Sequence, residues 1–216
     1  MGVSREQAAE NRRAIVAAAT LLFRQRGVEA VGLNELMKHA GFTQGGFYNH
    51  FKSKAALVSE VLASAMAEGN SELAKNARAP VDESTTALQR YISCYLSKAH
   101  RDNIDHGCPV AGFAGDAPRL GAGAQSHFAG GLDDQITILA GLIAESGTPV
   151  AKGEHRTLRE RAISLHCAMV GALVLSRSVA QAAPTLSNEI LENAERDVLA
   201  TVDRSSSQAP KLRKEY

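Results

Sequence analysis

The sequence predicts an all-α protein, because hydrophobic residues recur with helical spacing and no segment alternates with period two. Glycine and proline fall mainly between the periodic segments. The chain has 216 residues, of which 44% are hydrophobic and 22% are charged. It is therefore long enough to bury a core, and its composition argues against a disordered chain.

The first predicted helix covers residues 5–26 and carries one apolar stripe. Ile15, Ala19 and Phe23 recur at intervals of four, which places them on one face of an amphipathic helix. Gly27 follows a basic last turn, where a glycine commonly ends a helix.

Two short helices follow, at residues 33–40 and 43–51, with a tight turn at Gly41 between them. This is the layout of a helix-turn-helix. Phe47 and Phe51 lie four residues apart and are expected to point into a small core. The opposite edge of the second helix is polar and is the candidate functional surface.

The polar edge suits the major groove of DNA. Gln44 and Asn49 carry amides that can bond base edges in pairs. Thr43, Tyr48 and Lys54 can bond phosphates, which position a protein on the duplex. The alternative is a helical hairpin that only packs against its neighbours.

Gly45 and Gly46 stand side by side within this second helix. Each costs about 1 kcal/mol relative to alanine inside a helix. Two in one turn make sense where the backbone must come very close to another molecule, such as a phosphate or a base edge.

The rest of the chain also predicts helices. One begins at Lys54 after a Ser53 cap and runs to Met66, and the last is expected to begin after a Ser187 cap with Leu186 and Leu191 as a hydrophobic staple. Between Met66 and the end of the chain, helices are expected at about 71–78, 84–101, 109–117, 125–146, 155–182 and 188–203.

Charge is distributed unevenly along the chain. Residues 1–54 hold eight Lys and Arg against four acids, whereas residues 55–203 hold twelve against eighteen. A basic head on an acidic body indicates that the head meets a polyanion, although ordinary surface scatter is the alternative.

Residues 11–62 resemble the DNA-binding domain of the TetR/AcrR family of transcriptional regulators. The resemblance rests on a long pattern of glycines, aromatic residues and a Ser-Lys pair. Its members are Ile15 to Ala19, Leu22-Phe23, Arg26-Gly27, Leu33 to Leu36, Ala40 to Thr43, Gly45, Phe47-Tyr48, Phe51, Ser53-Lys54 and Leu57. The pattern departs at Gly32, where Ser or Thr is usual.

The resemblance implies a homodimer that binds operator DNA and responds to a small-molecule inducer. It implies a helix-turn-helix domain over residues 1–54, a helical ligand-binding and dimerisation domain over 55–204, and a polar tail, expected to be disordered, over 205–216. The DNA contacts that it implies are Thr43, Gln44, Gly45, Tyr48, Asn49, His50 and Lys54.

The C-terminal helices resemble the family's dimer bundle at residues 170–177 and 186–191. The run 162–175 is apolar almost all round, so we expect burial by the chain's own body and by a partner. A central core helix of a monomer is the alternative. Because this run is also short and interrupted, we expect no membrane span.

A ligand pocket is expected among the helices of the second domain. Its lining is predicted from aromatic, sulfur-containing and aliphatic residues at helical spacing, which also fits an ordinary core. The predicted lining residues are Tyr91, Tyr95, Cys108, Phe113, Phe128, Ile136 and Met169.

Cys108 precedes Pro109, which suits the first position of a helix. A cysteine at such a helix start can have a lowered pKa and sense oxidants or electrophiles, and a subgroup of the family carries a similar Gly-Cys. The alternative is a small packed residue. Cys94 and Cys167 are expected to be inert core residues.

Other classes of function find little support. A Cys108–His106 pair lacks a third orienting residue, and neither a phosphate-binding loop nor zinc-ligand spacing occurs, so we expect no enzyme, cofactor or metal. The N-terminus lacks the pattern of a signal peptide, and three cysteines do not form a disulfide framework, so we expect a cytoplasmic protein.

Overall fold

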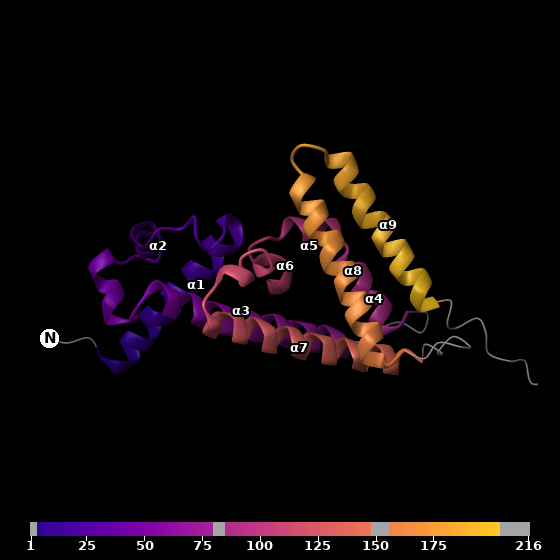
Figure 1. The fold of residues 1–216 in the computed structure, drawn as a ribbon, viewed down its shortest axis with the longest axis horizontal. Helices are drawn as coiled ribbons and strands as arrows, with labels where there is room; N and C mark the ends of the chain where they lie inside the picture. Colours follow the sequence, from indigo (N-terminus) through magenta and orange to yellow (C-terminus); the bar gives the residue numbers. More distant parts are fainter. Residues whose placement is uncertain (1–3, 80–84, 148–155, 204–216) are drawn as a thin grey trace, which may run out of the picture. The chain divides into compact units, whose positions relative to one another are not determined.

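The computed structural model describes residues 4–79, 85–147 and 156–203, and every regular element within them is a helix (Figure 1). The predicted all-α class is therefore confirmed for these residues, while the predicted disordered tail lies outside them. The elements are α1 (Arg5–Arg26), α2 (Leu33–His39), the 3₁₀ helix η1 (Gln44–Asn49), α3 (Lys54–Arg78), α4 (Ala87–Tyr95), α5 (Lys98–Asp102), α6 (Pro109–Phe113), the 3₁₀ helix η2 (Ala117–Arg119), α7 (Ala122–Glu145), α8 (Leu158–Val179) and α9 (Pro184–Asp203).

The chain forms two compact units. The first comprises Met1–Ser71 and Asn103–Asp133, and the second comprises Glu72–Asp102 and Asp134–Tyr216. The first unit thus joins the predicted helix-turn-helix segment to a distant segment that contains α6 and η2. Helices α3 and α7 each contribute residues to both units.

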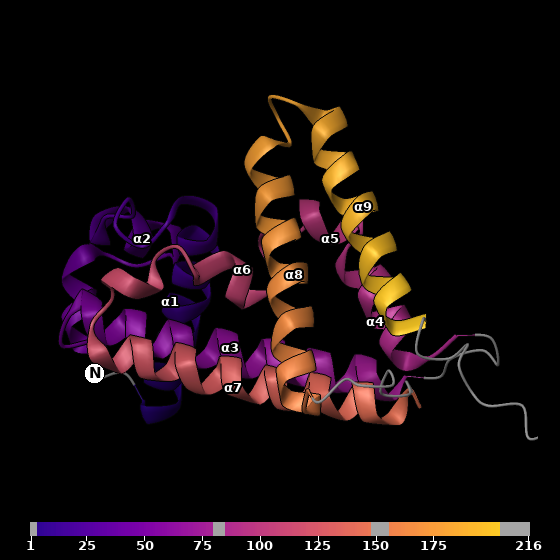
Figure 2. The same cartoon turned by 45° about the vertical axis from the view of Figure 1, so that its right-hand side comes forward.

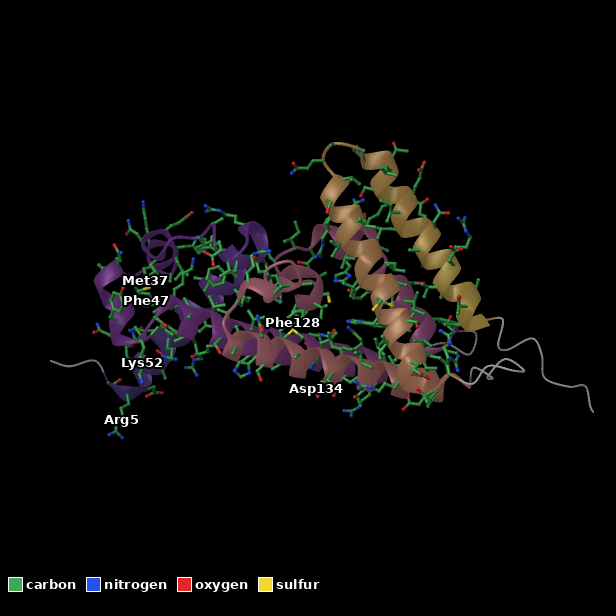
Figure 3. All side chains as sticks on the ribbon, viewed as in Figure 1. Arg5, Met37, Phe47, Lys52, Phe128 and Asp134 are labelled. Atoms are coloured by element: carbon green, nitrogen blue, oxygen red, sulfur yellow. The ribbon has the colours of Figure 1, made fainter. Side chains whose placement is uncertain are left out.

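The core of the first unit gathers the predicted apolar stripes. Ile15, Ala19 and Phe23 of α1 are fully buried, as the periodicity predicted. Met37 of α2 and Phe47 of η1 are fully buried with them and lie close together in Figure 3. This shared core fixes the turn between α2 and η1.

Local signals set the ends of these helices as predicted. Gly27 and Gly41 adopt positive φ angles of 83° and 84°, which a side chain would strain. The Ser53 hydroxyl accepts a hydrogen bond from the Ala56 amide at 3.1 Å and so caps α3. Gly32 occupies the N-cap of α2 without a side-chain bond.

Helix α3 is longer than predicted, because it continues through Gly69 to Arg78 without the expected break. Within the first unit, α3 and α7 lie side by side in both views (Figures 1 and 2). A Cβ added at Gly131 would lie 2.5 Å from the Cβ of Met66. This close packing against α7 stabilises α3 despite the presence of Gly69.

Two other boundaries differ from the prediction. The helix expected at 84–101 is interrupted after Tyr95, because the Ser97 hydroxyl bonds the Cys94 carbonyl and caps α5 through the His100 amide. The helix expected at 109–117 ends at Phe113 and is followed by the short η2.

In the second unit, α8 and α9 run antiparallel as neighbours (Figure 2). The expected start of the last helix at residue 188 is wrong, because α9 begins at Pro184. Ser187 is therefore no cap: it is fully buried inside the helix, and its hydroxyl lies 2.8 Å from that of Ser176 on α8. Each hydroxyl also lies 2.9 Å from the backbone carbonyl of the other serine, so both have acceptors in the contact between the helices.

The expectation of inert, buried cysteines is wrong at Cys94 and Cys167, both of which are exposed. No disulfide links the three cysteines, all of which are described. By length and composition alone α8 is apolar enough to cross a membrane, as core helices of soluble proteins also are.

Candidate nucleic-acid interface

The second helix of the helix-turn-helix is a 3₁₀ helix rather than the expected α-helix. The Gly46 amide donates to the Thr43 carbonyl at 3.0 Å, and the His50 amide donates to Phe47 at 2.9 Å, both three residues back. Thr43 occupies the N-cap, but its side chain makes no cap bond. Adjacent glycines at 45 and 46 weaken the α-helical form here.

The polar edge of this helix faces outward, as its sequence pattern predicted. Tyr48 is 67% exposed, whereas the neighbouring Phe47 is fully buried and stacks on Phe51 at 5.5 Å between ring centroids. His50 is half-buried beside Phe42. The exposed members of the predicted contact set are Thr43, Gln44, Gly45, Tyr48 and Asn49.

Gly45 has no packing reason to lack a side chain. A Cβ added there would meet nothing within 4 Å, whereas one at Gly46 would lie 3.7 Å from the Thr43 hydroxyl. The space above Gly45 is open, so an external molecule can approach the backbone closely.

Arg12 holds the end of η1 in place. Its Nε donates to both carboxylate oxygens of Glu60 on α3, at 2.9 and 3.1 Å, and its guanidinium lies 4.0 Å from the centroid of the Phe51 ring. A further guanidinium nitrogen donates to the His50 carbonyl. Arg12 therefore ties α1, the end of η1 and α3 together, although no local sequence signal indicated it.

Lys54 is directed toward the chain itself. Its Nζ donates to the Val28 carbonyl at 2.7 Å and lies 5.9 Å from the centroid of the Phe23 ring. One of its three N–H groups is therefore engaged within the protein. Its predicted phosphate contact would use another.

The end of α1 is also bonded to the segment around α6. The Asp116 carboxylate accepts from the Val28 amide at 3.1 Å and from Arg119 at 3.0 Å. Arg24 donates to the Gly107 carbonyl at 2.5 Å. The loop after α1 is thus held by α3 on one side and by residues 107–116 on the other.

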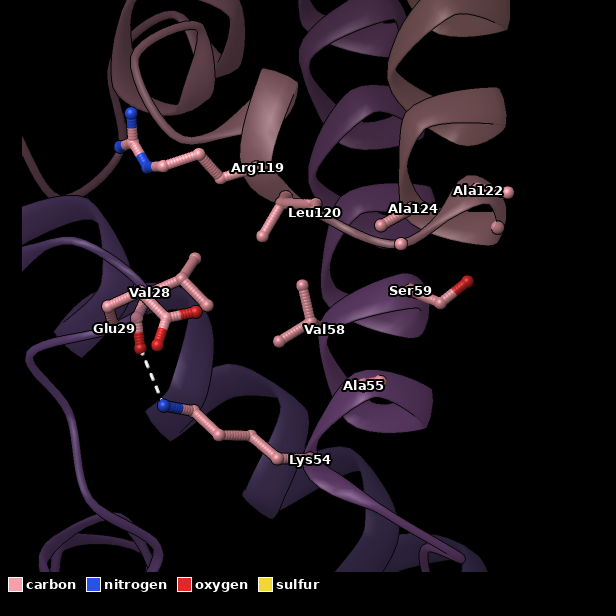
Figure 4. A pocket seen from close by; sticks show the side chains of 12 residues that line it. Val28, Glu29, Lys54, Ala55, Val58, Ser59, Arg119, Leu120, Ala122 and Ala124 are labelled. Atoms are coloured by element: carbon pink, nitrogen blue, oxygen red, sulfur yellow. Dashed lines mark hydrogen bonds between the residues drawn. The ribbon is translucent and has the colours of Figure 1, made fainter.

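A pocket of about 380 Å³ lies in the first unit, between the loop after α1, the start of α3 and the start of α7. Figure 4 shows Val28, Val58 and Leu120 around it, with Lys54 along one side. None of the predicted ligand-pocket residues lines it. The predicted pocket in the second domain therefore stays a prediction.

The predicted pocket residues fall in both units. Phe113 is fully buried in the core of the first unit, and Phe128 packs against that core. In the second unit, the rings of Tyr91 and Tyr95 lie 5.8 Å apart. Ile136 is half-buried and Met169 fully buried there. Within the described residues, no three His, Cys, Asp or Glu side chains are grouped to hold a metal ion.

Cys108 occupies the N-cap of α6, as the sequence predicted, and is half-buried. The helix is only five residues long, so its dipole is small. Gly107 is buried, and its carbonyl is the acceptor for Arg24. The segment that carries the thiol is thereby bonded directly to α1.

The fold and this edge define a helix-turn-helix protein. Residues 15–61 match the family model described as bacterial regulatory proteins, tetR family. The N-terminal segment is therefore similar to the TetR family, and the predicted resemblance is confirmed. The HTH-type transcriptional regulator AcrR of Shigella flexneri is 43% identical over 58 residues. That match spans only 27% of this chain and 27% of AcrR.

Solved structures share the fold over most of the chain. The reduced form of E. coli NemR superposes with a TM-score of 0.69 at 23% identity, covering 88% of this chain and 95% of NemR. A TetR-family regulator from Agrobacterium tumefaciens gives 0.73 at 18% identity, covering 90% and 98%. The predicted architecture, an N-terminal helix-turn-helix followed by a helical C-terminal part, is confirmed.

Proposed function

We propose that this chain is a TetR-family transcriptional regulator that binds double-stranded operator DNA as a homodimer and is released by a small-molecule ligand. The observation that carries the proposal is the exposed edge from Thr43 to Asn49, with open space above Gly45. The similarity to AcrR, whose name is that of an HTH-type transcriptional regulator, supports it. We expect the protein in the cytoplasm, where operator DNA lies.

The contacts divide by chemistry. Gln44 and Asn49 present amides that can read base edges, each good pair contributing about 1–3 kcal/mol of discrimination. Tyr48 and Lys54 would bond phosphates, which fix register without reading sequence. Repression, the usual mode of the family, follows when the bound dimer occludes a promoter.

The proposal is tested by measuring binding of the purified protein to the DNA beside its own coding region, using fluorescence anisotropy. Gln44→Ala and Asn49→Ala should relax sequence preference, while Tyr48→Phe and Lys54→Ala should weaken binding to all sequences. Asn193→Ala, an exposed amide on α9, is the control. Binding unchanged by all four edge variants would overturn the proposal.

Release by a ligand follows from the geometry of a dimer on DNA. Two recognition helices must lie about 34–36 Å apart to enter successive major grooves. A ligand that binds better to a dimer with another spacing shifts the population away from DNA. The loop after α1 is bonded both to Lys54 and to Asp116. A movement of α3 or of the segment after α6 would therefore be transmitted to the helix-turn-helix.

A second candidate is release by modification of Cys108. The observation that favours it is the bond from Arg24 to Gly107, next to the half-buried thiol at the N-cap of α6. The reduced form of NemR has a similar fold. Release from DNA by a quinone that persists in Cys108→Ser would exclude this candidate.

A further inference from the structure

One histidine of the second unit is buried without a partner for its side chain. His166 lies on the inward stripe of α8 with Ala162, Met169 and Leu173, and it is 4% exposed. Neither Nδ1 nor Nε2 has a hydrogen-bond partner in the part of the chain that the structure describes. Its three stripe neighbours are fully buried and apolar.

Such a side chain is costly to the folded protein. Burial lowers the pKa of His166, so the ring is neutral near pH 7 and has one N–H donor and one acceptor nitrogen. Both lose their bonds to water without replacement. Further along the same helix, Ser176 is also buried, but its hydroxyl donates to the Ser187 carbonyl at 2.9 Å.

We propose that His166 is the polar anchor of a binding site for a small, uncharged, mainly apolar molecule that carries a hydroxyl group. A hydroxyl can donate to the acceptor nitrogen of the ring or accept from its N–H. A charged ligand would meet no compensating charge on the stripe of Ala162, Met169 and Leu173. Such pockets are typically apolar with few polar groups that fix orientation.

This inference rests on the proposed function only for its regulatory meaning, since the bound molecule would be the effector. The inference also predicts that removing the histidine stabilises the ligand-free protein. In His166→Leu, an apolar side chain of similar size replaces two unpaired groups, so the ligand-free protein should melt at a higher temperature. The same variant should lose the ability to recognise a hydroxyl.

The test compares phenol with toluene, which has nearly the same shape but carries a methyl in place of the hydroxyl. Binding to the full-length protein without DNA is measured by NMR with ¹⁵N-labelled histidine, the ring signals of His166 being assigned by their loss in His166→Leu. We expect wild-type protein to prefer phenol by about tenfold, which is about 1.4 kcal/mol. Phenol should also shift the ring nitrogens of His166.

Two further variants sharpen the outcome. His166→Gln keeps a donor and an acceptor and should retain part of the preference for phenol. His127→Leu, at an exposed histidine on α7, is the matched control and should leave the preference unchanged.

Equal binding of phenol and toluene to wild-type protein and His166→Leu overturns the inference, as does a His166 ring that does not respond to phenol. Neither result touches the DNA-binding assay, so failure of this inference and failure of the proposed function are distinguishable.

Discussion

At the scale of single residues, Arg12 shapes the recognition surface without belonging to it. Arg12→Ala should lower the free energy of unfolding by about 1–2 kcal/mol, because the contacts to Glu60 and to the His50 carbonyl are lost. Operator affinity should fall several-fold as the end of η1 loosens. Arg13→Ala, an exposed neighbour, is the control in urea unfolding and should have little effect on stability. Equal stability losses in the two variants would contradict this role.

The half-buried His100 and the buried His166 predict how stability depends on pH. Burial is the main cause that lowers the pKa of His100 and of His166 from 6.5, and nearby Arg177 acts in the same direction on His100. The unfolded chain therefore binds more protons below that pH, so stability should fall as pH drops from about 7.5 to about 5.5. Urea unfolding at the two values checks this, and His166→Leu should show a shallower fall. A stability that rises on acidification would contradict it.

At the scale of elements, Asp116 joins the segment after α6 to the loop after α1. Asp116→Ala leaves the Val28 amide unpaired at a residue that is 2% exposed, so it should cost about 1–3 kcal/mol in chemical unfolding. Asp116→Asn keeps an acceptor and should cost less. Because the same loop holds Lys54, operator binding should weaken in the alanine variant even though residue 116 is outside the predicted contact set. Wild-type stability in Asp116→Ala would refute the link.

Sequence patterns predicted the elements of the first unit better than the bonds between them. The stripe of Ile15, Ala19 and Phe23 and the outward edge around Tyr48 follow from local periodicity, which the chain itself displays. The contact of Arg12 with Glu60 spans 48 residues, so no local pattern contains it. The 3₁₀ form of η1 reflects a balance between glycine propensity and core packing that periodicity alone does not resolve.

In the second unit, too, local sequence patterns did not predict the contacts between helices. Ser187 has the residue type and spacing of a cap, yet its pairing with Ser176 depends on how α8 and α9 meet. Pro184 was the better signal for the start of the helix, since proline is favoured at the first helical position. His166 gave no local sign that its ring would be buried without a partner.

At the scale of the whole molecule, the proposed dimer should depend on α8. Leu175 is 60% exposed and Ile163 is 38% exposed on this helix. Leu175→Glu would place a charge in an apolar interface, so it should shift light-scattering mass toward the monomer and weaken operator binding at least tenfold. Gln7→Glu, at an exposed site of the first unit, should leave the mass unchanged. A dimer unaffected by Leu175→Glu would place the interface elsewhere.

The absence of a side chain at Gly131 lets α3 and α7 approach closely, and the adjacent Gly130 provides a matched control. A methyl group at residue 131 would collide with the Cβ and Cγ of Met66, whereas one at residue 130 would meet nothing within 4 Å. Two alanine substitutions one position apart should therefore have opposite signs: Gly130→Ala should raise the melting temperature through helix propensity, and Gly131→Ala should lower it by pushing the two backbones apart. A pair of melting curves would report whether this glycine sets how near two long helices can run.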